Sequence, residues 1–542
     1  MFAFQKTPDG NGESYRSEVF FMRSKNLLSL HEKDVLTLNT ENRKGDQNFV
    51  CETTWETLPY GEHGLQTNLG LKLGEEPHLL QILRSRLMCF WRTDLGFLDS
   101  SYSDDYGESW TPTLIQKPLS LNQEQQSSRK KKYNVQNNPI EHGNNYTETN
   151  KDNSSESTNE LLVSNRAQYL SSPAYLRDVI SNHNILRNPR GAITPIQLSD
   201  DYYALLFYNN GHTEKVGYVG RLVYWLTLGI ASKDNRFIVW SQPEIVLWWD
   251  GILLDDRENW NEDWAIVDGA GYADFQELEN GNLVFVESNK LTVRYHEISA
   301  SILTTMKKQL LRKNDKSLDG GKVELSRNLA SSYRQKILNK YKDDVVYVYK
   351  KYMGLSPPVR APVLPDLRSG GGFSFIFWIN LSKLIIGNTD KKEKKYTLVN
   401  GMSTVSGALD EEHAADIDKG YEIVFTEDGK LYLFITDGFK TTFHFEIEFS
   451  STADDHYGVK SNKLSMVSFI VDGGPKVASC VINDRLYNAA PSGWKFFPRE
   501  LGEIGGSNVD VNQNLVEAYV IFDKALLTSE CIDIYQTAPY TK

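Results

Sequence analysis

The chain has 542 residues, a formal net charge of −12 at pH 7 and 40% hydrophobic residues. This length exceeds what one hydrophobic core holds, and the apolar content excludes a wholly disordered chain. The negative charge argues against nucleic acid as the main partner, because phosphate recognition needs a positive surface. No apolar run approaches the roughly 18 residues that span a bilayer, so we expect no membrane span.

Short strands separated by turn residues are predicted for most of residues 1–298. Apolar runs of strand length recur with Gly, Asn and Asp between them, which is typical of antiparallel β-meanders. Examples are EVFFMRS at 18–24, YYALLFYNN at 202–210 and LTVRYHEI at 291–298. Residues 118–162 contain almost no apolar residue, and we therefore expect a disordered, low-complexity insertion there.

A different pattern occupies residues 299–370. SASILTTMKKQLLRK and SSYRQKILNKYKDD repeat apolar residues at helical spacing, and SPPVRAPVLPDLRSGGG has the composition of a linker. Strands return over residues 371–542, a length suited to a β-sandwich. The prediction is an all-β protein with two β units, 1–298 and 371–542, joined by a helical connector.

The four cysteines leave their pairing open. Cys51 and Cys89 lie early and Cys480 and Cys531 late, so one disulfide in each unit and buried free thiols are both compatible with the sequence. No Cys/His cluster indicates zinc, and we expect no metal or other cofactor. The start lacks the features of a signal peptide, whereas three Asn-X-Ser/Thr sequons fit an extracellular or lysosome-like compartment, so localisation stays open.

The sharpest local motif runs from Ser103 to Trp110. Its pattern is S-x-D-x-G-x-x-W, the Asp-box hairpin of sialidases and other propellers. We expect Ser103 and Asp105 to accept backbone N–H groups, Gly107 to take a positive φ, and Trp110 to pack the hairpin onto its neighbours. The motif marks a fold and carries no catalytic group.

Longer stretches extend this resemblance. RNPRGAITPIQLSDDYYALLFYNNG, WSQPEIVLWWD and GYADFQELENGNLVFVESNKLTVRYHEI resemble parts of sialidase-superfamily propellers, and VDGGPKVASCVINDRLYNAAPSGWKFF resembles the closing strands of a laminin-G-like domain. The order of modules is similar to that of trans-sialidases. The resemblance covers about three-quarters of the chain. It implies a five- or six-bladed β-propeller, a helical connector and a C-terminal jelly-roll sandwich of the laminin-G/concanavalin type.

The same resemblance implies a set of site residues. Retaining sialidases clamp the substrate carboxylate with arginines and use a tyrosine nucleophile that a glutamate activates, with an aspartate as acid and base. Tyr272, Glu244 and Asp274 stand in the corresponding places. The candidate clamp residues are Arg92, Arg190 and Arg221. Each side chain also has a structural alternative: a core tyrosine, a turn-capping glutamate or an internal ion pair.

Departures from the family pattern leave the function open. The Arg-Ile-Pro motif that opens sialidases is absent; Arg16 and Arg23 lie in that region without the Ile-Pro context. After the insertion is removed, about 250 residues remain in the N-terminal unit, which only just suffices for six blades of roughly 40 to 45 residues each. We expect glycans or glycoconjugates as partners. The hypotheses are an exo-acting sialidase-like glycosidase with a lectin-like accessory domain, an inactive glycan-binding or adhesion protein, and a uronate polysaccharide lyase.

Overall fold

The computed structural model of the protein contains antiparallel β-sheets and, in its described part, two α-helices. The residues that it describes are 2–6, 18–24, 55–58, 65, 75–82, 86–93, 96–111, 186–188, 191–209, 223–232, 237–248, 272–288, 293–311, 345–350, 364–380, 395–406, 416–426, 429–438, 441–448, 464–488, 493–505 and 509–537. The predicted all-β class is confirmed.

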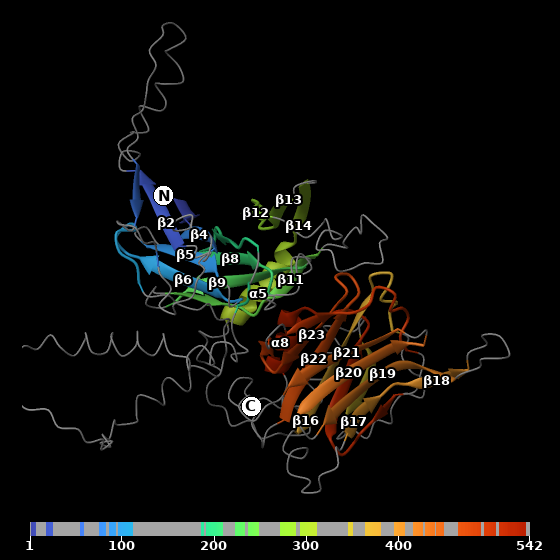
Figure 1. Cartoon of the computed structure of the whole chain (residues 1–542). Helices are drawn as coiled ribbons and strands as arrows, with labels where there is room; N and C mark the ends of the chain where they lie inside the picture. Colours follow the sequence, from blue (N-terminus) through green and yellow to red (C-terminus); the bar gives the residue numbers. More distant parts are fainter. Residues whose placement is uncertain are drawn as a thin grey trace, which may run out of the picture.

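Four sheets come from the first 298 residues (Figure 1). The first holds β1 (Phe2–Lys6), β2 (Glu18–Ser24) and β3 (Trp55–Leu58). The second holds β4 (Glu75–Gln81), β5 (Leu87–Arg92) and β6 (Leu98–Ser103). The third holds β7 (Thr194–Gln197), β8 (Tyr202–Phe207), β9 (Val223–Ala231), β10 (Ile238–Trp240) and β11 (Glu244–Trp248). The fourth holds β12 (Tyr272–Glu277), β13 (Leu283–Ser288) and β14 (Val293–Ile298).

These four sheets pack face to face in chain order. Successive side chains of a strand point to opposite faces, so one strand can serve two cores. On β5, Cys89 and Trp91 pack toward the first sheet, whereas Met88 and Phe90 join the core shared with the third sheet. On the third sheet, the alternate residues of β8 and β9 face the fourth sheet and α5 (Ala300–Leu311).

Two further sheets form a sandwich from the C-terminal part. The seven-stranded sheet holds β15 (Val345–Lys350), β16 (Gly372–Asn380), β22 (Leu464–Asp472), β23 (Val477–Ile482), β24 (Arg485–Leu486), β25 (Trp494–Phe496) and β27 (Val516–Phe522). The six-stranded sheet holds β17 (Lys395–Asn400), β18 (Ser403–Ser406), β19 (Asp416–Thr426), β20 (Lys430–Asp437), β21 (Thr442–Glu448) and β26 (Asp510–Val511). Helix α8 (Thr528–Thr537) follows β27.

The two sandwich sheets differ in how many faces they bury. On β21 the exposed and buried residues alternate strictly, so only one face meets the core between the sheets. On β16 every residue from Phe373 to Ile379 is buried. Phe375 and Phe377 of β16 fill the core of the sandwich, and Trp378 faces the other way. The seven-stranded sheet is therefore covered on both faces.

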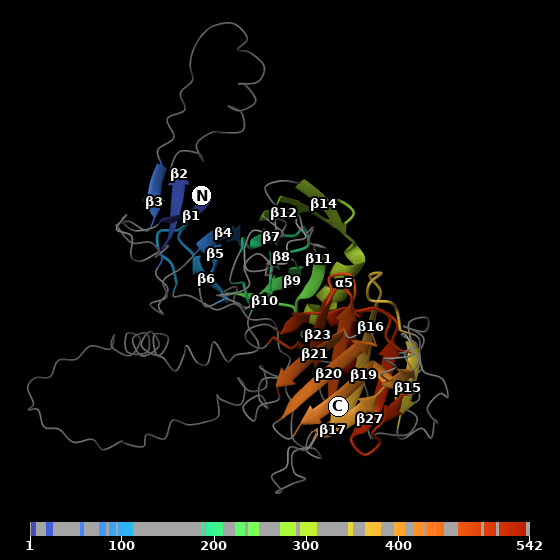
Figure 2. The same ribbon diagram turned by 45° about the vertical axis from the view of Figure 1, so that its right-hand side comes forward.

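The second face of that sheet packs against the N-terminal sheets. One core contains Phe90, Trp225 and Trp240 from the N-terminal sheets together with Trp378 from β16 and Ile532 from α8. Helix α8 also contacts α5 beside this core. The two parts of the chain lie against each other in both views (Figure 1, Figure 2). The sandwich and the N-terminal sheets thus share apolar surface and are not separated by a linker at this contact.

Polar groups also link the N-terminal sheets to the sandwich at this contact, which we call the junction. The indole Nε1 of Trp494 donates to the carbonyl of Asn209 at 2.7 Å, and the Asn488 amide donates to the Asn209 side chain at 3.2 Å. The backbone N–H of Leu486 donates to Gln242 Oε1 at 3.1 Å. Asn209 and Asn488 are buried, so their polar atoms depend on partners from across the junction.

We expect Trp494→Phe to destabilise the protein by about 1–3 kcal/mol, because it leaves the buried carbonyl of Asn209 without its indole donor. Trp225→Phe is the matched control: the ring of Trp225 lies 6.2 Å from that of Trp494, and its indole N–H has no hydrogen-bond partner among the described residues. Urea unfolding of both variants measures the difference. Equal losses of stability would contradict a role for the Trp494–Asn209 hydrogen bond.

The connector predicted over 299–370 is only partly helical. Its first helix is confirmed as α5, whereas residues 345–350 form β15, which extends the seven-stranded sheet through pairing with β27. The second predicted helix, at 331–344, and the insertion at 118–162 lie outside the described residues. The domain boundaries stay predictions. Neither described helix combines the length and apolarity needed to cross a membrane.

Candidate functional site

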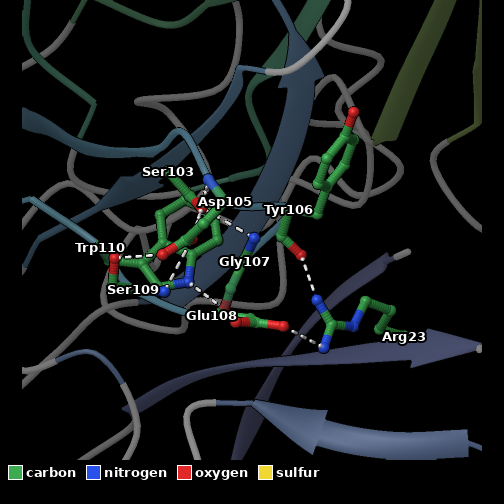
Figure 3. Close-up of polar contacts among 8 residues, drawn as sticks. All are labelled: Arg23, Ser103, Asp105, Tyr106, Gly107, Glu108, Ser109 and Trp110. Atoms are coloured by element: carbon green, nitrogen blue, oxygen red, sulfur yellow. Dashed lines mark hydrogen bonds and ion pairs between the residues drawn. The ribbon is translucent and has the colours of Figure 1, made fainter.

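The Asp-box hairpin holds a network of short hydrogen bonds (Figure 3). Ser103 Oγ accepts the N–H of Gly107 at 2.7 Å and donates to Asp105 at 2.7 Å, and Asp105 accepts the N–H of Ser109 at 2.8 Å. Gly107 has a φ of +92°. Partial burial raises the pKa of Asp105, but the hydrogen bonds from Ser109 and Ser103 outweigh it and bring the pKa to about 2. The carboxylate therefore stays ionised and holds the turn.

The hairpin is fastened to the first sheet. The ring of Trp110 stacks on Phe21 of β2 with centroids 4.2 Å apart. Arg23 of the same strand donates to the carbonyl of Tyr106 at 3.0 Å and pairs with Glu108 at 3.3 Å, as Figure 3 shows. Arg23, which lies in the region of the absent Arg-Ile-Pro motif, is thus engaged with this turn.

Arg92, Glu76 and Tyr272 meet where β4, β5 and β12 come together. Arg92 Nε donates to Glu76 Oε2 at 2.9 Å, and Tyr272 Oη donates to Glu76 Oε1 at 3.1 Å. The side chains of Arg92 and Glu76 are 16% and 17% exposed, whereas Tyr272 is 53% exposed. One carboxylate therefore bridges a guanidinium and a phenol that solvent can reach.

The backbone of β4 is distorted where it presents Glu76. The pairing of β4 with β5 shifts register between Glu75 and His78, which is a β-bulge. Glu76 has a φ of +51° and precedes Pro77, although a residue before proline normally adopts extended backbone. Such strain costs on the order of 1–3 kcal/mol and concentrates at functional sites. The distortion directs the Glu76 carboxylate toward Tyr272.

Two more titratable side chains border this cluster. Burial lowers the pKa of His78, and the nearby charge of Asp274 raises it in part, so the imidazole is mainly neutral at pH 7. Asp274 lies two residues after Tyr272 on β12 and therefore on the same face of the strand, with about 7 Å between the Cα atoms. The tether between β7 and β12 is a hydrogen bond from Thr194 Oγ1 to the carbonyl of Ala273 at 2.7 Å. The site thus combines an acid, a phenol and an imidazole.

Glu244, the predicted activator of Tyr272, is bonded elsewhere. Its carboxylate accepts the backbone N–H groups of Thr528 at 2.7 Å and Ser529 at 2.5 Å, at the N-terminus of α8. Glu244 is buried, and burial raises its pKa to about 7 even though the hydrogen bonds from Ser529 and Thr528 lower it. The expected pairing with Tyr272 is not observed; Glu76 occupies that place.

The remaining candidate arginines, Arg190 and Arg221, lie outside the described residues. The backbone next to Arg190 is held by Asn188, whose amide donates to the carbonyl of Gly191 at 2.8 Å and accepts the N–H of Tyr208 at 2.9 Å. Gly191 has a φ of +89°, and a side chain there would collide with the ring of Tyr208. The structure therefore brings Arg92, Tyr272 and Asp274 to one region and sets Glu244 apart.

Glu76 and His78 are the residues of this site that the sequence analysis did not single out. The neighbouring Glu75 and Pro77 make the segment look like a turn before a strand. A carboxylate directly before a proline at a strand start was the available signal. Among the described residues, no group of three or more His, Cys, Asp and Glu side chains is arranged to hold a metal ion.

No protein-family model and no curated protein matches the chain. Solved structures match part of it. The ligand-binding domain of botulinum neurotoxin serotype D in complex with N-acetylneuraminic acid is 14% identical over 37% of this chain and 52% of that one, with a TM-score of 0.25. The binding domain of Paraclostridial Mosquitocidal Protein 1 is 15% identical over 35% and 45%, with a TM-score of 0.22. The chain thus covers about half of these structures or less, and we infer no function from them.

Proposed function

We propose that the protein is a carbohydrate-active member of the sialidase superfamily, with a site of exo-glycosidase type at Tyr272, Glu76 and Arg92 that acts on acidic sugar termini. The observation that supports this most is the hydrogen bond from Tyr272 Oη to Glu76 Oε1 at 3.1 Å. A phenol is a weak nucleophile at neutral pH unless a base accepts its proton, and Glu76 is placed to do so. Tyrosine nucleophiles are a known exception to the two-carboxylate scheme of glycosidases.

In the proposed reaction, Tyr272 Oη attacks the anomeric carbon while its proton passes to Glu76. The bond from that carbon to the leaving oxygen breaks, and Asp274 donates the proton that the leaving oxygen takes up. Water then attacks the anomeric carbon and gives a proton to Asp274, while the bond from that carbon to Tyr272 Oη breaks and Glu76 returns its proton to Tyr272. The sugar is released with net retention of configuration. A neutral nucleophile suits a sugar whose anomeric carbon already carries a carboxylate, because two anions would repel each other.

The fold part of the proposal is the five- or six-bladed β-propeller of the sequence analysis, with the four described N-terminal sheets as blades of it. Its support is their face-to-face packing in chain order, which uses opposite faces of β5, β8 and β9. In a β-propeller, small antiparallel sheets repeat around a central axis, so neighbouring sheets pack face to face in chain order. The strands that lie nearest the axis in different sheets then come close together. Tyr272 on β12 and Arg92 on β5 both bond to Glu76 on β4, although their sheets are not consecutive, and this convergence supports the proposal.

The test is hydrolysis of a fluorogenic sialoside by the purified protein, with the corresponding galactoside as the matched neutral substrate. We expect turnover of the sialoside and at least 100-fold less of the galactoside, because the clamp arginines gain a charge-assisted bond only with the acidic sugar. Equal turnover of both substrates would contradict an acidic-sugar site. Absence of turnover in a folded preparation would contradict the glycosidase.

Glycan binding without catalysis is the second candidate. It is favoured by the ion pair of Arg92 with Glu76, because an arginine engaged by an internal carboxylate is less available to a substrate carboxylate. The two candidates differ in one measurement: an inactive binder retains the sialoside unchanged in equilibrium dialysis, whereas a glycosidase releases the fluorophore.

A further inference from the structure

The carboxylate of Glu76 has two partners that act on it in opposite ways. Arg92 Nε donates to its Oε2 at 2.9 Å, and Tyr272 Oη donates to its Oε1 at 3.1 Å. The proton of Tyr272 moves to Glu76 only if Glu76 is basic enough to take it. A positive charge beside a carboxylate stabilises the ionised form and so makes the carboxylate a weaker base. Pairing with Arg92 therefore weakens the base of the proposed reaction.

Partial burial makes this effect strong. The side chains of Arg92 and Glu76 are 16% and 17% exposed, so water and salt screen their charges less than on an open surface. An opposite charge within about 4–6 Å changes the proton affinity of a carboxylate by roughly 10- to 1,000-fold. The register shift in β4 and the left-handed backbone of Glu76 before Pro77 also fix where this carboxylate stands. Glu76 therefore stays beside Tyr272 whatever Arg92 binds.

Arg92 is also one of the arginines expected to bind the carboxylate of an acidic sugar. A guanidinium has five N–H groups in a planar fork, so it can bond a second carboxylate beside the first or exchange one for the other. In both cases the negative charge of the sugar offsets the positive charge that acts on Glu76. Glu76 becomes a stronger base when an acidic ligand is bound.

We propose that the Arg92–Glu76 ion pair keeps the site inactive until a substrate carboxylate binds Arg92, and that this binding activates Tyr272 through Glu76. This inference rests on the proposed function and concerns the regulation of its site. In the activated state, Glu76 takes the proton of Tyr272 as its oxygen attacks the anomeric carbon. A neutral sugar leaves the ion pair intact and Tyr272 protonated. The site thus selects acidic sugars in the rate of the chemical step as well as in binding.

The first test compares a fluorogenic sialoside with its 1-carboxamide, which has the same leaving group but no negative charge. In the wild-type protein the carboxamide leaves Arg92 paired with Glu76, whereas Arg92→Gln has no positive charge to weaken Glu76. We therefore expect Arg92→Gln to raise kcat for the carboxamide roughly threefold or more. For the sialoside, kcat/KM should fall about tenfold or more, because its carboxylate loses a charged partner. Loss of a purely structural contact would not raise kcat for any substrate.

Arg23→Gln is the matched control. The Arg23 side chain is 17% exposed and pairs with Glu108 at 3.3 Å, but it lies at the Asp-box turn, so its loss should leave kcat for both substrates unchanged. Unfolding midpoints show whether each variant is folded. An unchanged or lower kcat for the carboxamide in folded Arg92→Gln would overturn the inference.

The second test needs no turnover and uses the wild-type protein with Glu76→Gln as its control. Binding of N-acetylneuraminic acid is measured by calorimetry at about pH 5, close to the range in which glutamate titrates, in buffers of different ionisation enthalpy. We expect the wild type to take up protons on binding and Glu76→Gln to take up none, because the ligand carboxylate raises the proton affinity of Glu76. Uptake that persists in Glu76→Gln would assign it to His78 or Asp274, which border the pair, and would overturn the inference. Absence of binding or of uptake would overturn it as well.

The two tests separate this inference from the proposed function. Turnover of the sialoside without proton uptake and without a higher kcat in Arg92→Gln would keep the glycosidase and refute the role of the ion pair. Proton uptake without any turnover would show that the ion pair responds to an acidic ligand and would refute only the glycosidase.

Discussion

Replacing Tyr272 with phenylalanine is expected to lower turnover of an acidic glycoside by about 10³-fold or more, because the variant lacks the oxygen that forms the covalent intermediate. The substitution removes one atom from a half-exposed side chain, so the fold has little reason to change. Initial rates with the fluorogenic sialoside, together with unfolding midpoints, measure both effects. A variant that retains more than a tenth of the wild-type rate would remove Tyr272 from the mechanism.

Glu76→Gln belongs to the same experiment. It keeps the shape of the side chain but removes the base, and a general base contributes about 10²- to 10⁴-fold to the rate. Tyr106→Phe is the control, since Tyr106 is also an exposed tyrosine and lies in the Asp-box turn. A loss in Tyr272→Phe without a loss in Glu76→Gln would leave the nucleophile in place and require a different base.

Replacing Glu244 with alanine is expected to destabilise the folded protein by about 2–5 kcal/mol, because two buried N–H groups of α8 lose their acceptor. The lost hydrogen bonds connect the N-terminal sheets to the sandwich, since Glu244 belongs to β11 and its partners belong to α8. Urea unfolding measures it. A loss below 0.5 kcal/mol, roughly the range of ordinary surface substitutions, would mean that solvent replaces the carboxylate without cost.

Glu244 also makes stability depend on pH. Burial raises the pKa of Glu244 in the folded state to about 7, above the ordinary glutamate value of 4.5, so the folded state binds a proton more readily than the unfolded state does. The resulting stabilisation is fully present below about pH 4.5 and is lost as pH rises through about 7, an effect of up to about 3 kcal/mol. Glu244→Gln should flatten this dependence between pH 5 and 8 relative to the wild type. An unchanged slope would show that other groups cause it.

The strand content was predictable because it follows from local patterns. The strict alternation of β21 gives one buried face, and the unbroken apolar run of β16 indicates burial on both faces. That second pattern, in FSFIFWI, fits a sheet that is covered on both faces, a conclusion that the sequence analysis did not draw. Which surface covers the outer side of the sandwich could not be predicted, because the contacts join residues with no shared periodicity, such as Trp494 and Asn209.

The candidate site was predictable only in part. Tyr272 and Asp274 follow from the family resemblance, and Arg92 follows from its position at the end of a strand core. Glu76 does not, because its contact with Tyr272 joins residues 196 positions apart and depends on a bulge and a left-handed backbone. The sequence around Glu244 is compatible with activation of Tyr272. A buried carboxylate near a helix N-terminus, however, accepts hydrogen bonds from the first backbone N–H groups of the helix, which have no partner within it.

The distribution of thiols has a practical consequence. Cys89, Cys480 and Cys531 are free and buried, and each belongs to a different core: the contact of the first two sheets, the interior of the sandwich, and the junction. Burial raises the pKa of all three well above the usual value, so none reacts while its core stays closed. Labelling by a thiol reagent, followed residue by residue, would therefore time the opening of three regions of one molecule without any introduced probe.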